Sequence, residues 1–143
     1  MNLDDLFNKC STVNNNKIVV VEENQRKFII NNAQGKTIRK VLVDGCLIDD
    51  HRQRCDYLFE IDDPCTLAIY VELKGKDIEK AFNQLIATLD YLSQKHKNCH
   101  KECYIIASKV PKAGPQVQVL KTKLAKSHKV QLFVFTGEYK KNI

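Results

Sequence analysis

The sequence predicts an α/β fold in which a mixed central β-sheet is flanked by helices. Two apolar runs, YLFEI and TLAIYVEL, are separated by the turn-forming DDPC, a pattern typical of a β-hairpin. Residues 78–92 then repeat apolar side chains at helical spacing, which predicts a helix that packs on the sheet. The segments that follow alternate strand, helix and strand, and this order implies crossover connections. At 143 residues the chain is expected to form one domain, 1–143.

Composition places the chain in an ordinary class of globular proteins. It is 43% hydrophobic and 28% charged, which favours neither disorder nor a membrane protein. Its first residues, MNLDDLFNK, are acidic where a signal peptide would be basic and then apolar. We therefore expect a cytoplasmic protein with no membrane partner. In that compartment the six scattered cysteines are expected to be reduced.

The elements before the hairpin follow from apolar patterning. Residues 3–7 predict a short helix, and the polar stretch STVNNN predicts a loop. KIVVVEEN, QRKFIINN and TIRKVLVDG each read as a strand, with Gly35 in the turn between the second and third.

After the hairpin, helix signals dominate. Asp77 is the expected N-cap of the helix over 78–92, whose polar flank carries Lys80, Gln84 and Thr88. CYIIAS and VQLFVF are the expected last two strands, and Pro115 is expected to open the helix between them. His96 is expected at the surface.

Charge is distributed unevenly along the chain. Up to Tyr70 there are nine basic and eleven acidic residues, whereas from Val71 onward there are fourteen basic and six acidic residues. A basic second half suits a phosphodiester partner, and acidic residues near the hairpin suit a cation. The same pattern is also compatible with a solvated, lysine-rich surface.

Three ionisable residues stand at one end of the hairpin. Asp56 opens the first strand, and Glu72 and Lys74 close the second on a shared face. The strands are apolar enough to be covered on both faces, where an uncompensated charge is costly. This arrangement favours a functional site over strand-end charges that only reach toward water.

An Asp, a Glu-x-Lys on the partner strand and a following helix with a polar Gln resemble the PD-(D/E)xK nuclease superfamily. The resemblance is closest from Val43 to Leu92 and implies a restriction-endonuclease-like core. Cys55 stands where the family has proline, and Thr88 stands four residues after Gln84, where exonuclease-like members have tyrosine.

The resemblance implies a metal-dependent nuclease that hydrolyses phosphodiester bonds, with DNA favoured over RNA. Asp56, Glu72 and the backbone carbonyl of Leu73 are the implied ligands of Mg²⁺ or Mn²⁺. Lys74 is the implied assistant of the attacking water, and Gln84 is the implied auxiliary residue.

Further residues are candidates for supporting roles. Glu22, Glu23 and Asp44 lie at other strand ends and are candidates for a third carboxylate. A second group is expected to contact nucleic acid: Arg54, Lys76, Lys80, Lys112, Lys121 and Lys123.

Two other functions stay open. The first is a catalytically inactive nuclease-fold module that binds nucleic acid or protein. The second is a zinc protein centred on Cys99 and Cys103, but C-x3-C without a second ligand pair disfavours a zinc site. A homodimer or a partner protein is compatible with the small size of the chain.

Overall fold

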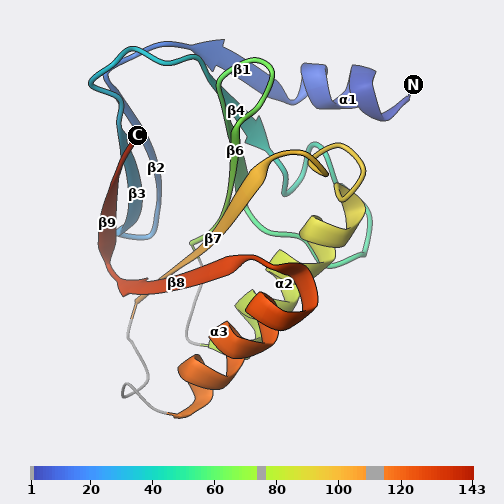
Figure 1. Cartoon of the computed structure of the whole chain (residues 1–143), viewed down its shortest axis with the longest axis vertical. Coiled ribbons are helices and arrows are strands. Elements are labelled where there is room, and N and C mark those ends of the chain that lie inside the picture. The colour runs from blue at the N-terminus through green and yellow to red at the C-terminus, as the bar shows by residue number, and fades with distance from the viewer. Residues whose placement is uncertain (1, 74–76, 109–114) are drawn as a thin grey trace.

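The computed structural model describes residues 2–73, 77–108 and 115–143, and these ranges contain three helices and nine strands (Figure 1). The helices are α1 (Leu3–Lys9), α2 (Ile78–Tyr91) and α3 (Pro115–His128). The strands are β1 (Ser11–Asn14), β2 (Ile18–Glu23), β3 (Arg26–Asn31), β4 (Ile38–Leu42), β5 (Tyr57–Ile61), β6 (Leu67–Glu72), β7 (His100–Ala107), β8 (Gln131–Thr136) and β9 (Glu138–Asn142).

The strands form two mixed sheets, so the predicted α/β class is confirmed. The larger sheet has the order β1-β4-β5-β6-β7-β8. In it, β1 pairs with β4, β4 with β5 and β5 with β6 in antiparallel orientation, whereas β6 with β7 and β7 with β8 are parallel pairs. The smaller sheet has the order β2-β3-β9, with β3 and β9 parallel. The parallel pairs β6/β7 and β7/β8 are those that the predicted crossover connections require, whereas the parallel pairing of β3 with β9 was not predicted.

The expectation that helices flank the central sheet is right for one face and wrong for the other. Helices α2 and α3 lie on one side of the large sheet, and the β2-β3-β9 sheet covers the opposite side (Figure 1). Alternation along the hairpin divides the two cores: Leu58 and Tyr70 face the helices, whereas Phe59 and Val71 face the second sheet. The hairpin is therefore buried on both faces, as its continuous apolar runs predict.

Several local predictions are confirmed. Gly35 has φ +63°, a conformation that glycine adopts without a steric penalty. Asp77 caps α2 by accepting the backbone N–H of Lys80 at 3.0 Å. Helix α3 begins at Pro115. The predicted loop STVNNN, in contrast, contains β1, which pairs with β4. None of the helices in the described ranges is long and apolar enough to cross a membrane.

The prediction that every cysteine is reduced is wrong. Cys10 and Cys46 form a disulfide that joins the residue after α1 to the turn after β4. Cys55, Cys65, Cys99 and Cys103 are free thiols. Spacing alone did not single out this pair, because 36 residues separate its two members.

Thr88 is not part of an exposed polar flank as the sequence predicts, because its side chain is fully buried. Its hydroxyl accepts the backbone N–H of Cys55 at 2.9 Å and donates to the carbonyl of Gln84 at 3.0 Å. The hydroxyl thus joins α2 to the residue that precedes Asp56.

We predict that removing the disulfide lowers the free energy of unfolding. Cross-linking residues this far apart restricts the unfolded chain, and the expected loss is about 3 to 4 kcal/mol. Urea unfolding of the wild type and of a Cys10→Ala/Cys46→Ala variant measures it. Addition of a reductant should shift the wild-type midpoint and leave that of the variant in place. An unchanged wild-type midpoint would contradict the prediction.

A second prediction concerns Thr88. Thr88→Val keeps the shape of the side chain but leaves the buried N–H of Cys55 without its acceptor, so the free energy of unfolding should fall by about 1 to 3 kcal/mol. Thr88→Ser retains the hydroxyl and is the matched control. Equal urea midpoints for Thr88→Val and Thr88→Ser would show that the hydrogen bond contributes nothing.

Candidate functional site

The hairpin places Asp56 directly before β5 and Glu72 at the end of β6. The last pair of the β5/β6 ladder is Tyr57 with Val71, and the backbone N–H of Asp56 also donates to the Val71 carbonyl, at 3.2 Å. Asp56 and Glu72 therefore lie at the same end of the hairpin. Their exposed fractions are 4% and 0%, so both carboxyl groups lie in the interior. The convergence of these two carboxylates on a metal ion stays a prediction.

Backbone hydrogen bonds hold Asp56 from three sides. The Leu73 N–H donates to Asp56 Oδ2 at 2.8 Å, which ties the carboxylate to the residue after β6. The Asp56 carbonyl accepts the N–H groups of Val43 and Asp44 at 3.1 and 3.3 Å. The Leu73 bond holds the Asp56 carboxylate against the end of β6, because a buried carboxylate needs hydrogen-bond donors. The other two bonds hold the Asp56 backbone against the residues after β4.

The raised pKa values of Cys55 and Tyr57 indicate a negative electrostatic environment at this end of the hairpin. Burial raises the pKa of the Cys55 thiol, and the charges of Glu72 and Asp56 add to the rise, whereas the hydrogen bond with Thr88 opposes it. Burial also raises the pKa of Tyr57, with further contributions from Asp56, Glu23 and Asp44. Carboxylates from four segments therefore act on the stretch 55–57.

The candidates for a third carboxylate differ in their surroundings. Asp44, after β4, donates its backbone N–H to the Asp56 carbonyl and so lies beside Asp56. Glu23, at the end of β2, contributes to the raised pKa of Tyr57. Glu22 is exposed and forms an ion pair with Lys27 at 3.6 Å. Of the three candidates, Asp44 has a hydrogen bond to Asp56 among the described residues.

Arg54 is engaged within the protein. Its Nε donates to Asp44 Oδ1 at 2.9 Å, and its Nη1 donates to the backbone carbonyls of Asp50 and Arg52. The guanidinium therefore organises the loop before β5 and neutralises part of the charge of Asp44. Its predicted contact with nucleic acid has to compete with these bonds.

The remaining predicted residues lie in three places. Gln84 is half-buried on α2, one turn before Thr88, and Lys80 is exposed in the first turn of the same helix. Lys121 and Lys123 lie on different sides of α3, where they line separate depressions. Three predicted lysines lie outside the described residues: Lys74, Lys76 and Lys112.

A cavity of about 510 Å³ lies between α3 and the start of β7 and β8, away from Asp56. Its lining includes His100, Lys121 and Lys129. His100 pairs with Leu67 at the start of β6, whereas Glu72 is the last residue of β6, so the cavity and the carboxylates are at opposite ends of the strand. A basic lining without carboxylates suits an anion, whereas the buried carboxylates at the Asp56 end suit a cation.

Sequence reasoning missed a second polar cluster in the core. His96 is fully buried, not at the surface as predicted, and its Nε2 donates to Glu60 Oε2 at 2.5 Å. Its Nδ1 contacts the hydroxyl of Tyr70, which is also fully buried. Cys65 lies within reach of Glu60 and His96. The signal that the sequence did offer was Glu60 itself, a charge within the otherwise apolar strand YLFEI.

Comparison with known proteins adds no relative. No family model matches the chain, and neither the curated proteins nor the solved structures contain a significant match. The function is therefore inferred from the geometry of the chain itself.

Proposed function

We infer that the protein is a Mg²⁺- or Mn²⁺-dependent nuclease that hydrolyses phosphodiester bonds of DNA. The observation that carries this proposal is the burial of two carboxylates, Asp56 and Glu72, at the same end of a central hairpin. Burial of ionisable groups in a shared position is more typical of a functional site than of a structural accident.

The topology around the pair supports the proposal. Strands β4, β5 and β6 form an antiparallel meander, α2 follows directly, and β7 returns parallel to β6. This order is compatible with the restriction-endonuclease-like core that the motif residues imply. In such a core the aspartate, the glutamate and the lysine two residues after it share one end of the hairpin.

The donor set fits a hard cation. Asp56, Glu72 and the Leu73 carbonyl offer only oxygen atoms, which are the ligands that Mg²⁺ prefers. The bound ion would neutralise phosphate charge and lower the pKa of a coordinated water. The protein's part is to hold the carboxylates, and the Leu73 N–H bond to Asp56 does this directly. Lys74, two residues after Glu72, is proposed to orient the water, and Gln84 to hold it from α2.

Removing either carboxyl charge is expected to abolish cutting. In Asp56→Asn the amide oxygen still accepts the Leu73 N–H, and Glu72→Gln preserves side-chain volume, so both variants should fold. The expected loss of Mg²⁺-dependent cleavage is about 100-fold or more, because the developing charge is no longer stabilised. Supercoiled, linear and branched DNA are incubated with each purified variant, with Mg²⁺, Mn²⁺ or a chelator.

Glu102→Gln is the matched control for this experiment. Glu102 is a buried carboxylate on β7, where it accepts the Tyr104 hydroxyl at 2.8 Å and pairs with Lys141 at 3.1 Å. Cleavage that persists in Glu102→Gln and is lost in Glu72→Gln supports the assignment. Cleavage that survives Asp56→Asn and Glu72→Gln equally would falsify it. DNA binding without cleavage by the wild type would favour the inactive binding module.

A further inference from the structure

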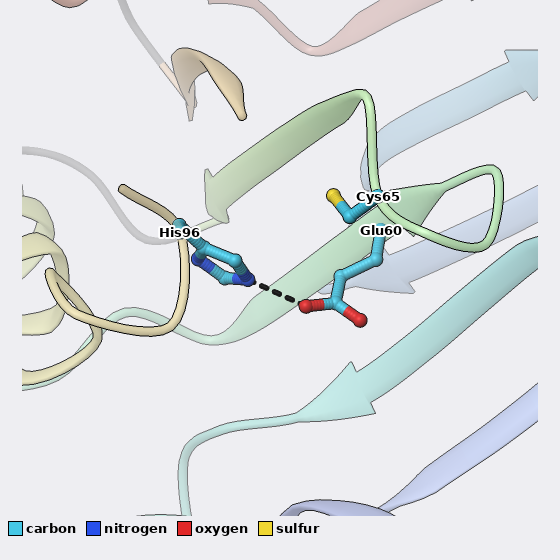
Figure 2. Close-up of side chains that lie close together, drawn as sticks. All are labelled: Glu60, Cys65 and His96. Carbon is cyan, nitrogen blue, oxygen red and sulfur yellow. Dashed lines mark hydrogen bonds and ion pairs between the residues drawn. The ribbon is translucent and has the colours of Figure 1, made fainter. Parts of the chain in front are cut away.

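A cluster distinct from the proposed nuclease site lies toward the other end of the same hairpin. Glu60 comes from β5, Cys65 from the turn between β5 and β6, and His96 from the loop after α2 (Figure 2). One donor atom of each residue lies within 4.8 Å of the other two. Figure 2 shows the imidazole pointing at the Glu60 carboxylate, with the Cys65 side chain beside it.

Cys99 lies beside this cluster, and its thiol is outside the group of donor atoms that lie within 4.8 Å of one another. Its thiol donates to the Cys65 carbonyl at 3.2 Å, and the two thiols also interact with each other. Its backbone N–H donates to the His96 carbonyl at 3.1 Å, which closes a tight turn between these two residues. The donors therefore form two pairs, Glu60 with Cys65 and His96 with Cys99. Structural zinc sites are usually built from two such pairs, each from a short stretch of chain.

Tyr70 and Arg39 contact two of the proposed ligands and would hold their side chains in place. The Tyr70 hydroxyl contacts Nδ1 of His96, and a histidine that ligates a metal usually engages its other ring nitrogen in this way. Arg39 Nε lies 3.8 Å from the Glu60 oxygen that does not contact His96. One carboxylate and two thiolates carry three negative charges, which a divalent ion together with the Arg39 guanidinium balances.

A small cavity gives access to the cluster. Its volume is about 40 Å³, and its lining includes Arg39, Glu60, Cys65 and the two aspartates of the turn, Asp62 and Asp63. This volume exceeds what one water molecule needs, roughly 10 to 15 Å³. The aspartates at the cavity favour the approach of a cation.

We propose that Glu60, Cys65 and His96 bind a transition metal ion of the zinc class, and that Cys99 becomes the fourth ligand when its thiol turns from the Cys65 carbonyl toward the ion. Thiolate and imidazole donors select Zn²⁺ over Mg²⁺, so this ion is chemically separate from that of the proposed nuclease site. In a tetrahedral site the His96 Nε2 and Glu60 Oε2 atoms would stand roughly 3.4 Å apart, given zinc–ligand distances of about 2.1 Å. Binding therefore requires the present 2.5 Å contact to open and the ring proton to stand on Nδ1, toward the Tyr70 hydroxyl, so that the Nε2 lone pair is available to the ion. The bound ion would join the hairpin turn to the loop after α2.

The test is a Co²⁺ titration followed by displacement with Zn²⁺. The full chain is stripped of metal with a chelator and handled without oxygen and without added thiol, so that the Cys10–Cys46 disulfide stays intact. We expect one equivalent of Co²⁺ to produce the visible bands of tetrahedral Co²⁺ and a thiolate charge-transfer band. Zn²⁺ should abolish both and protect Cys65 and Cys99 from alkylation.

Three variants and one control identify the ligands. Cys65→Ser should remove or weaken the charge-transfer band and lower Zn²⁺ affinity, and Glu60→Gln should lower the affinity. Tyr70→Phe should lower it by about 10- to 100-fold, as expected for a residue that orients a ligand. Glu102→Gln changes a carboxylate of the same 8% exposure outside the cluster and should leave the affinity unchanged. Circular dichroism of each variant confirms folding.

The proposal is overturned if the stripped wild type gives no thiolate band and gains no alkylation protection. It is also overturned if Cys65→Ser and Glu60→Gln bind Zn²⁺ as tightly as Glu102→Gln does. In either case the cluster is a hydrogen-bonded network of the core. Because none of these measurements uses DNA cleavage, their outcome is independent of the proposed nuclease activity.

Discussion

Burial of the β5–β6 hairpin on both faces is the constraint on which the rest of the structure depends. A charged group placed there leaves water and must find donors or counter-charges within the protein. Asp56 finds the Leu73 N–H, and Glu60 finds His96 and Arg39. The contacts of Glu60 join the hairpin to the loop after α2 and to β4, whereas the contact of Asp56 joins the start of β5 to the residue after β6. The buried charges therefore organise the fold at the two ends of its central element.

The same constraint explains which parts of the fold the sequence predicts. Continuous apolar runs predicted the hairpin, and the apolar stripe over 78–92 predicted α2, because both patterns depend on local periodicity. At the candidate site, the sequence places Asp56 and Glu72 at the open end of one hairpin, because a short turn sets which residues of the two strands lie there.

Contacts between distant segments were not predictable in this way. Strand β9, with sequence EYKKN, carries almost no apolar signal and is a strand because β3 offers it a parallel partner. Cys10 meets Cys46, and His96 meets Glu60, only after segments distant in sequence have packed together. The periodicity of apolar residues does not indicate which distant segments pack together. His96 looked exposed because its neighbours in sequence are polar, whereas its neighbours in space are Phe7, Glu60 and Tyr70.

The two ends of the hairpin differ in donor chemistry, and this difference separates their proposed ions. At the Asp56 end the donors are oxygen atoms, and hard cations such as Mg²⁺ accept them while retaining water for chemistry. At the Glu60 end, sulfur and nitrogen donors accompany the carboxylate. Such donors suit a softer ion, whose four coordination positions the protein would fill. A closed site suits a structural role, and an open one suits hydrolysis. One strand pair can hold both because the length of the hairpin keeps the two donor sets apart.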